Sequence, residues 1–258
     1  MTDAKPPVLE LRDIWKTYSG PRQGEAKEGR KSTLSGVSIN VRKGEIYGFV
    51  GLNGAGKTTS IKIALGLTFP DTGEIRWFGE PPTPQVFERI GFAPEKSSFY
   101  EFLTGGETLD FSSRLLSRKP SSDRTRQVLE TVGLAEDRDK KVSAYSKGMQ
   151  QRLALAAAML HDPEVFILDE PSSGLDPLGR MTIKSILLDL RKVGRTVFFS
   201  THILADVNEI CDRIGVIHKG RMLYEGSLKE FNPSGGDLEK RFVELIRRED
   251  PTPPVGGM

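Results

Sequence analysis

The chain has 258 residues, enough to bury a full hydrophobic core as one large domain or as one domain with an inserted lobe. Its 37 lysines and arginines against 35 aspartates and glutamates leave a formal net charge of +2. This balance does not indicate a strongly basic nucleic-acid surface overall, although a local basic patch stays open. The single cysteine, Cys211, excludes an internal disulfide and gives no metal-binding pattern, so we expect it in the core.

The sequence contains no pattern typical of a secretion signal or a membrane helix. Residues 1–7 are polar and contain prolines, without the apolar stretch of a signal peptide. The longest apolar run, Leu153 to Leu160, is far shorter than the ~20 residues that a membrane helix needs. We therefore expect a soluble chain that works in the cytoplasm.

The first part of the chain predicts antiparallel β-structure. Residues 8–14 alternate as a half-buried strand, residues 19–31 are Gly-rich and charged as in a mobile hairpin loop, and residues 36–42 predict a second strand. A turn then leads to a short apolar strand over 45–50. A further strand is expected over 74–78, after a turn that contains Pro70 and Gly73.

Residues 51–59, with the sequence GLNGAGKTT, fit the P-loop pattern G-x-x-x-x-G-K-[ST]. The apolar strand before them and the helical spacing of residues 60–65 supply the strand, turn and helix that this loop requires. The glycines let the backbone turn its N–H groups inward, and the helix that begins near Lys57 adds its positive dipole end. The loop therefore predicts a cage for the phosphates of a nucleotide.

The side chains of this loop have separate expected roles. The ammonium of Lys57 is expected to reach the β- and γ-phosphate oxygens, and the Thr58 hydroxyl to bind Mg²⁺. Thr59 is placed to bond the α-phosphate. The nucleotide-binding residues expected in the loop are Gly51, Asn53, Gly54, Ala55, Gly56, Lys57, Thr58 and Thr59.

Helical patterns replace strands from about residue 97 to residue 162. Thr104 and Glu107 have the spacing of a capping box and introduce a helix to about Arg118. Residues 121–123 predict the start of a second helix that runs to Thr131. A third helix begins around Lys147, with a core-facing stripe of Leu153, Ala156, Ala157 and Leu160. We interpret this region as a helical lobe inserted into a parallel α/β core.

The α/β pattern resumes after this lobe. Residues 165–168 form a continuous apolar run, typical of a strand buried on both faces. A second buried strand is expected over 196–200. The remaining expected elements are helices over 177–192, 203–213 and 237–249, strands over 214–218 and 222–224, and a Pro/Gly tail over 250–258.

Two adjacent acids, Asp169 and Glu170, follow the strand over 165–168. Ligands of open α/β sheets bind at the carboxyl ends of the strands, and neighbouring side chains at a strand end point in different directions. We expect Asp169 to hold Mg²⁺ and Glu170 to polarise the water that attacks the γ-phosphate. The other interpretation is two exposed turn acids before Pro171.

Residues 145–152, YSKGMQQR, open a predicted helix and resemble the signature motif of ATP-binding cassette (ABC) ATPases, usually Leu-Ser-Gly-Gly-Gln. Ser146 and Gly148 are retained, whereas Lys147 replaces the first glycine and Met149 the glutamine. The resemblance implies that this helix start receives the γ-phosphate of the ATP bound by a partner subunit. A helix cap without function is the alternative.

Further motifs of the ABC family follow in the expected order. Tyr18 stands where the family stacks an aromatic ring on adenine, although a lone tyrosine also suits packing. Residues 173–176 match the D-loop, which crosses the dimer interface, although Asp176 also suits a plain helix cap. His202 stands where the family's switch histidine contacts the γ-phosphate and the attacking water. The other two histidines, His161 and His218, match no motif, and we expect them on the surface.

Glu95 stands where the family's Q-loop most often has glutamine. A carboxylate there can approach Mg²⁺ or its bound water, but it also adds negative charge beside the triphosphate. A simple hinge between the core and the helical lobe is the other role. Glutamate at this position and the signature sequence are more similar to the corresponding motifs of ATPase subunits of bacterial and archaeal exporters than to those of importers.

The resemblance implies an α/β P-loop NTPase fold with a mixed central sheet, an N-terminal antiparallel β-subdomain and an inserted helical subdomain at about 97–162. The ATPase domain would span 8–231, between an N-terminal tail (1–7) and a C-terminal helix with a Pro/Gly tail (232–258). The implied ligands are ATP and Mg²⁺.

The implied mechanism is nucleotide-driven closure of a dimer, most simply a homodimer, that powers a separate membrane permease from the cytoplasmic face of the membrane. No nucleic-acid partner is expected. Export is favoured, with an importer ATPase or a soluble non-transport ABC ATPase as alternatives.

Overall fold

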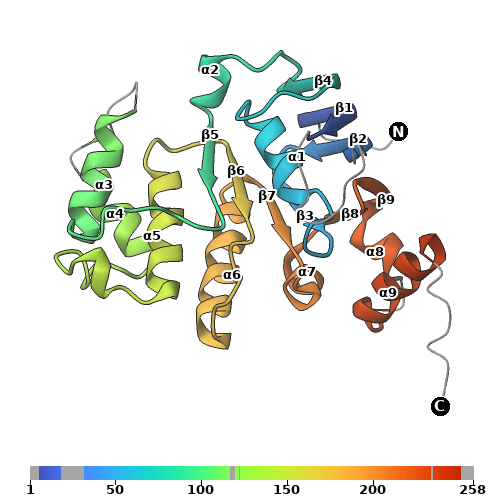
Figure 1. Ribbon diagram of the computed structural model, residues 1–258. Helices are drawn as coiled ribbons and strands as arrows, with labels where there is room; N and C mark the ends of the chain where they lie inside the picture. Colours follow the sequence, from blue (N-terminus) through green and yellow to red (C-terminus); the bar gives the residue numbers. More distant parts are fainter. Residues whose placement is uncertain (1–5, 19–31, 117–119, 122, 234, 251–258) are drawn as a thin grey trace, which may run out of the picture.

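The fold is a computed structural model that describes residues 6–18, 32–116, 120–121, 123–233 and 235–250. Two sheets form its framework: an antiparallel sheet with the strand order β2-β1-β4 and a six-stranded sheet with the order β5-β6-β7-β3-β8-β9 (Figure 1). The strands are β1 (Pro7–Thr17), β2 (Ser32–Arg42), β3 (Ile46–Val50), β4 (Thr72–Trp77), β5 (Ile90–Ala93), β6 (Val165–Asp169), β7 (Thr196–Thr201), β8 (Arg213–His218) and β9 (Arg221–Ser227).

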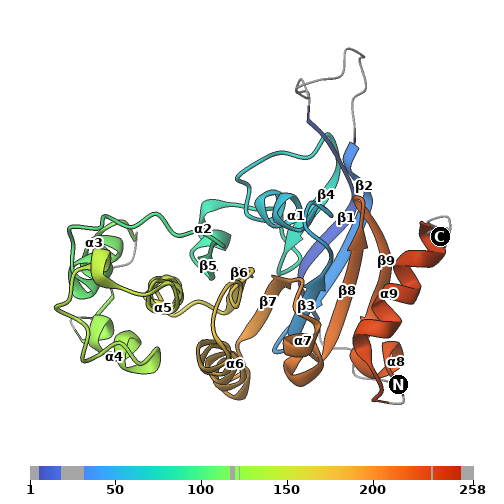
Figure 2. The same cartoon turned by 60° about the horizontal axis from the view of Figure 1, so that its bottom comes forward.

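Helices cover both faces of the larger sheet. Figure 2 shows α1 between the two sheets, and α6 and α7 on the opposite face of the larger one. The helices are α1 (Lys57–Ala64), α2 (Pro84–Phe87), α3 (Gly105–Arg114), α4 (Arg124–Thr131), α5 (Lys147–Met159), α6 (Pro177–Lys192), α7 (Leu204–Ile210), α8 (Leu228–Phe231) and α9 (Leu238–Glu249), with a 3₁₀ turn at Val142–Ala144.

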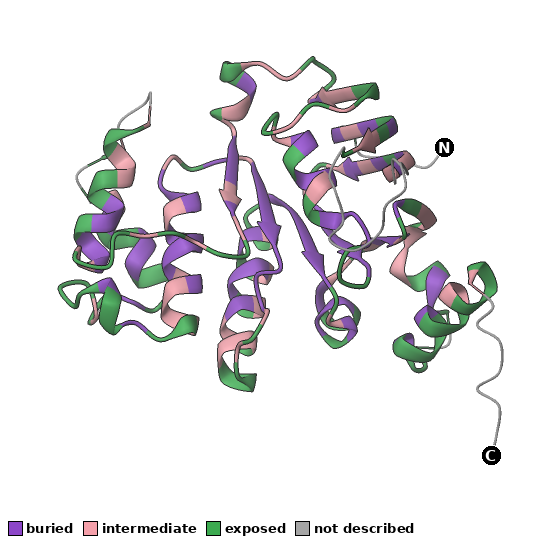
Figure 3. Ribbon diagram, viewed as in Figure 1, coloured by how far each residue is buried: buried purple, intermediate pink, exposed green. Residues whose placement is uncertain are grey.

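The central strands are rich in apolar residues because each contributes to two cores. In β7, Val197 and Phe199 pack in the core under α5, α6 and α7, whereas Phe198 packs in the core that contains α1 and the small sheet. All residues of β3, β6 and β7 are buried (Figure 3). Strands β5, β6, β7, β3 and β8 run parallel and β9 is antiparallel, so their arrangement confirms the predicted P-loop NTPase fold with a mixed sheet.

The helical lobe consists of α3, α4 and α5 and lies in sequence between β5 and β6, which are neighbours in the sheet. The Thr104 hydroxyl accepts a hydrogen bond from Glu107 N (3.2 Å), and Thr104 N donates to the Glu107 carboxylate (2.8 Å). This reciprocal pair is the predicted capping box. At the start of α5, Ser146 Oγ accepts from Met149 N at 3.2 Å.

Replacing Thr104 with alanine is expected to destabilise the protein by about 1 kcal/mol, the typical cost of losing an N-cap side chain. The urea midpoint of unfolding measures this change. Thr131→Ala is the matched control, because the Thr131 hydroxyl bonds only a carbonyl of its own helix and lies at the exposed end of α4. Equal midpoints for the two variants would contradict a stabilising cap at Thr104.

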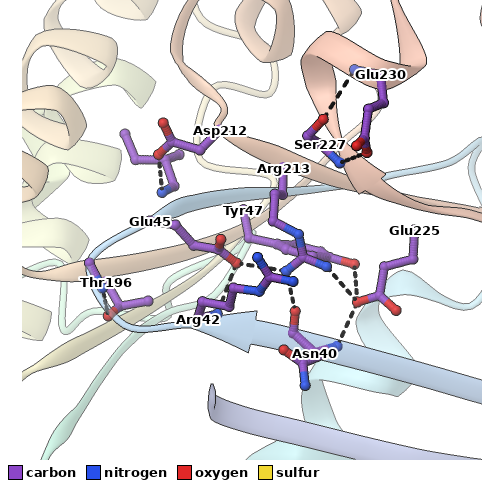
Figure 4. A network of polar contacts seen from close by, with 12 residues as sticks. Asn40, Arg42, Glu45, Tyr47, Thr196, Asp212, Arg213, Glu225, Ser227 and Glu230 are labelled. Carbon is purple, nitrogen blue, oxygen red and sulfur yellow. Dashed lines mark hydrogen bonds and ion pairs between the residues drawn. The ribbon is translucent and has the colours of Figure 1, made fainter. Parts of the chain in front are cut away.

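A partly buried polar network joins the two sheets at the first residue of β8 (Figure 4). Arg213 Nη1 donates to the carbonyl of Asn40 in β2 (2.6 Å) and lies 3.1 Å from Glu45 Oε1. Glu225 in β9 accepts from Asn40 N (2.6 Å) and from the Tyr47 hydroxyl (3.3 Å). Burial raises the pKa of the Glu45 carboxyl, whereas the Arg42 N–H and Arg213 oppose this rise. The network fixes β3, which leads into the P-loop.

Several sequence-based boundaries were wrong. The helix predicted from Thr104 to about Arg118 ends at Arg114, and the helix predicted over 203–213 covers only Leu204–Ile210. The second strand begins at Ser32 rather than Gly36, because it pairs with β1 along its length. The short helices α2 and α8 were not predicted. The predicted hairpin loop over 19–31 lies outside the described residues.

The prediction that His161 and His218 lie on the surface was also wrong, because both are partly buried and bonded. His161 Nε2 lies 3.0 Å from the carbonyl oxygen of Ile90, and burial lowers the pKa of this imidazole. His218 Nε2 lies 3.0 Å from Asp250 Oδ2 at the end of α9. Cys211 packs partly buried against the core, and burial raises the pKa of its thiol well above the usual value.

Candidate functional site

A cavity of about 350 Å³ opens beside the P-loop, at the carboxyl ends of the parallel strands. The P-loop connects β3 to α1, whereas Glu170 and His202 follow β6 and β7. The loops after three neighbouring strands therefore contribute to one site. The lining residues are Thr33, Asn53, Gly54, Gly56, Lys57, Thr58, Thr59, Glu95, Glu170, Ser173 and His202.

The P-loop backbone needs glycine at two of its positions. Gly56 caps α1 with a φ of +114°, and a Cβ there would lie 2.6 Å from Leu34 Cδ2. A Cβ on Gly51 would lie 2.5 Å from the carbonyl oxygen of Ile217. Any other residue at Gly51 would push against the backbone of β8, and at Gly56 it would adopt a strained φ and push against the Leu34 side chain, so glycine lets the loop lie close to the sheet.

Lys57 lies inside the curve of this loop, with only 6% of the residue exposed. Its ammonium donates to the carbonyl oxygens of Gly51 (2.7 Å) and Leu52 (3.3 Å). It also lies 3.1 Å from Glu170 Oε1. The cation is thus held inside the loop and next to the cavity.

Asp169 is buried below the cavity and contacts residues on two sides. Its Oδ2 accepts a hydrogen bond from the Thr58 hydroxyl (2.9 Å), and its Oδ1 accepts from the Ser200 hydroxyl (2.5 Å). These contacts join the first turn of α1 to the ends of β6 and β7. Asp169 is therefore no exposed turn acid.

Glu170 is 7% exposed and has a φ of +50°, an unusual conformation for a residue other than glycine. Its amide N donates to Ser200 Oγ (3.0 Å), and its Oε2 lies 2.8 Å from His202 Nδ1. The Lys57 ammonium is within ion-pair distance of Oε1 but outside hydrogen-bond geometry, so Oε1 has no donor among the described residues. A carboxylate oxygen held in this way can accept a proton from water.

A second cavity, of about 460 Å³, lies at the start of α5. Ser146, Lys147 and Gly148 line it, and Asp176 caps α6 on its other side by accepting a hydrogen bond from Gly179 N (2.6 Å). The remaining lining residues are Arg152, Gly174, Leu175, Leu178, Gly179 and Thr182.

The D-loop separates the two cavities. Ser173 lines the first, whereas Gly174, Leu175 and Asp176 line the second. The structure thus collects the candidate residues of this chain into two neighbouring groups, one around the P-loop and one around the signature segment.

Some predicted site residues line neither cavity. Tyr18 is 48% exposed, with the Lys16 ammonium 5.4 Å from its ring centroid. Met149 packs against the core of the helical lobe. Gly51 and Ala55 are buried in the loop beneath the cavity surface.

Sequence reasoning missed Thr33 and Ser200. Ser200 lies opposite Asp169 in the register of β6 and β7. Knowledge that these two strands are neighbours would therefore have identified Ser200 as a site residue. Thr33 follows the residues that the structure leaves undescribed, and the sequence around it contains no signal that marks a site.

Related proteins match this sequence over most of its length. A family model described as "ABC transporter" matches residues 34–173. An uncharacterised ABC transporter ATP-binding protein of Synechocystis is 44% identical over 238 residues, which cover 88% of this chain and 66% of that protein.

This chain belongs to the ABC transporter family. As an ABC ATPase it binds and hydrolyses ATP as the ATP-binding subunit of a transporter. Among its relatives, the bacitracin transport ATP-binding protein BcrA of Enterococcus faecalis is 38% identical, with 92% of this chain and 78% of that protein covered. A fluoroquinolones export ATP-binding protein of Mycobacterium tuberculosis is 42% identical, with 84% and 69% covered.

Solved ABC structures share the whole fold. An ATP-binding subunit of an ABC transporter superposes with a TM-score of 0.77 and 29% identity, covering 93% of this chain and 99% of that one. A dimeric ATP-binding cassette in a post-hydrolysis state, bound to ADP and phosphate, has a TM-score of 0.74 and 25% identity, covering 85% and 98%. Within the described part of this ABC chain, none of the helices combines the length and apolar character needed to cross a bilayer.

Proposed function

We propose that two copies of this ABC ATPase close around two ATP molecules and thereby power a separate membrane permease for export. The observation that carries the closure mechanism is the position of the D-loop, which lines both cavities of one chain. Each ATP would be held by the P-loop of one copy and by Ser146 and Gly148 of the other.

A twofold axis near the D-loop accounts for this arrangement. In a twofold dimer, two different patches on either side of the axis pair crosswise: the first patch of each copy contacts the second patch of its partner. The P-loop cavity of each copy would then face the signature cavity of its partner. The Ser146 hydroxyl and the first N–H groups of α5 form an anion-binding helix start, so they suit the γ-phosphate of ATP in the facing cavity.

In the proposed hydrolysis step, Glu170 accepts a proton from the water that attacks the γ-phosphate. His202, bonded to Glu170 Oε2, would orient the carboxylate and contact the γ-phosphate. Lys57 would stabilise negative charge on the β- and γ-phosphate oxygens in the transition state. Tyr18 and the remaining P-loop residues would bind the nucleotide without taking part in the chemistry.

The oxygen atoms beneath the cavity fit a magnesium ion. Mg²⁺ prefers hydroxyl and carboxylate oxygens as ligands. Thr58 Oγ1 and Asp169 Oδ2, which are joined by a hydrogen bond, would hold the ion together with Glu95, which lines the same cavity. When bound, the ion would supply charge neutralisation on the triphosphate.

The surface of the helical lobe offers a place for the permease to dock. Exposed aromatic side chains follow Glu95 and continue on α3: Tyr100 is 54% exposed, Phe102 69% and Phe111 43%. The Tyr100 ring lies 5.6 Å from each of the other two rings. An exposed apolar cluster of this kind is typical of a protein interface. We therefore treat residues 97–162 as a helical subdomain of the domain at 8–231, which would bind the permease at the cytoplasmic face of the membrane.

Export is favoured over import by Glu95 and by the relative that is named for fluoroquinolone export. An importer ATPase is the alternative. Purification of the chain from membranes together with its permease separates the two: an associated substrate-binding protein would favour import, and a permease without one would favour export.

Pairing of the copies tests the closure mechanism. A Glu170→Gln variant, which we expect to hydrolyse ATP slowly, should change from monomer to dimer when it is saturated with Mg·ATP. Light scattering after size exclusion measures the mass, and ADP in place of ATP serves as the control. A monomer under both conditions, alone and with the permease, would exclude closure of two copies.

A further inference from the structure

Two positions at the proposed interface depart from the family's motifs, and they do so with opposite charges. Lys147 stands in place of a signature glycine, and Glu95 stands in place of the usual Q-loop glutamine. Both residues are exposed, and neither forms an ion pair with any residue that the structure describes. Each therefore brings an uncompensated charge to a cavity.

Glu95 adds to an excess of negative charge around the P-loop. The cavity is lined by Glu95 and Glu170, and Asp169 lies directly beneath Thr58. Lys57 is the one lysine or arginine among the residues that line this cavity. A triphosphate bound there brings further negative charge, of which the proposed Mg²⁺ offsets only a part, so a carboxylate at position 95 raises the electrostatic cost of closing the site. A cation supplied from outside the chain would lower that cost.

Lys147 is an exposed residue beside the D-loop. As the first residue of α5, it lines the signature cavity. Its ammonium rests against Gly174, which has a φ of +67° and where a Cβ would clash with the ammonium. The charge thus lies on the D-loop, the segment that separates the two cavities. Facing a partner across this loop, a flexible lysine side chain can reach the opposite P-loop cavity.

We propose that Lys147 of each subunit pairs with Glu95 of the other subunit across the bound nucleotide. This inference rests on the proposed closure of two copies. Twofold symmetry forms two such pairs in each dimer. The lysine neutralises the carboxylate that the Q-loop adds beside the triphosphate. Both departures from the family's motifs then form one matched contact, which favours pairing of this chain with a subunit that carries the complementary charge.

A double-mutant cycle in the Glu170→Gln protein tests the pair, with the Mg·ATP concentration at half-maximal dimer formation as the measured quantity. Lys147→Gln should raise this concentration about tenfold, equivalent to about 1.4 kcal/mol for each of the two pairs. In the Glu95→Gln background the same change should have little effect, because the partner carboxylate is gone. Lys141→Gln, an exposed lysine of the same lobe that lines neither cavity, is the control.

Charge reversal gives a second measurement. Glu95→Lys and Lys147→Glu should each prevent dimer formation at ATP concentrations that suffice for the parent, and the combined variant should restore it. An equal effect of Lys147→Gln in both backgrounds would overturn the pair, because the lysine would then act on the triphosphate or on its own D-loop. A parent that never dimerises with ATP would instead overturn the closure mechanism and the pair with it.

Discussion

Replacing Glu170 with glutamine is expected to slow ATP turnover by about 10²–10⁴-fold and to leave ATP binding intact. This range is the typical contribution of a positioned general base. Glutamine keeps the shape of the side chain but cannot accept the proton of the attacking water. Phosphate release under saturating Mg·ATP measures the turnover, and equilibrium binding of a fluorescent ATP analogue measures the affinity.

Glu164→Gln is the matched control for this experiment. Glu164 precedes the same strand at its opposite end, where it pairs with Arg89 at 2.7 Å and lines neither of the two cavities. Its substitution should change turnover little. If Glu170→Gln hydrolysed ATP as fast as the parent, Glu170 would have no role in activating water.

Replacing Lys57 with alanine is expected to weaken ATP binding by about 10²–10⁴-fold. The ammonium is expected to donate two hydrogen bonds to charged phosphate oxygens, each worth about 1.5–3 kcal/mol, and every 1.4 kcal/mol is about a factor of ten in affinity. The substitution also removes the cation 3.1 Å from Glu170, which leaves that buried carboxylate uncompensated. Isothermal titration with ATP measures the loss.

Lys62→Ala provides the comparison, because Lys62 is an exposed lysine in the last turn of the same helix. It should bind ATP as the parent does. Circular dichroism of both variants separates lost binding from lost folding. Wild-type affinity in a folded Lys57→Ala protein would be incompatible with phosphate binding by this loop.

Local patterns in the sequence predicted most of the framework. The P-loop, the strand over 165–168 and the helix over 177–192 depend on neighbouring residues, so their positions were readable from spacing alone. Capping residues located the starts of α3 and α5 within one residue. These features are set by contacts that are close in the sequence.

Contacts between distant segments could not be predicted in the same way. The order β6-β7-β3 decides that Ser200 meets Asp169, and no local pattern contains that order. Helix ends were less accurate than helix starts, because the residues at the ends of α3 and α7, Leu115 and Cys211, are not typical capping residues that a sequence pattern marks. The contact of His161 with the Ile90 carbonyl joins residues that are distant in the sequence, so no local pattern predicts it.

The hydroxyl of Ser200 bonds both acids of the site, since it donates to Asp169 and accepts from the amide of Glu170. A hydroxyl has a single hydrogen. Because Ser200 donates this hydrogen to Asp169, only its oxygen lone pairs are left to accept the N–H of Glu170. The two acids consequently share one anchor and cannot be repositioned independently. A shift of β7 that moved Asp169 would displace Glu170 in the same motion, so under the proposed mechanism the end of this strand would control both the metal ligand and the base.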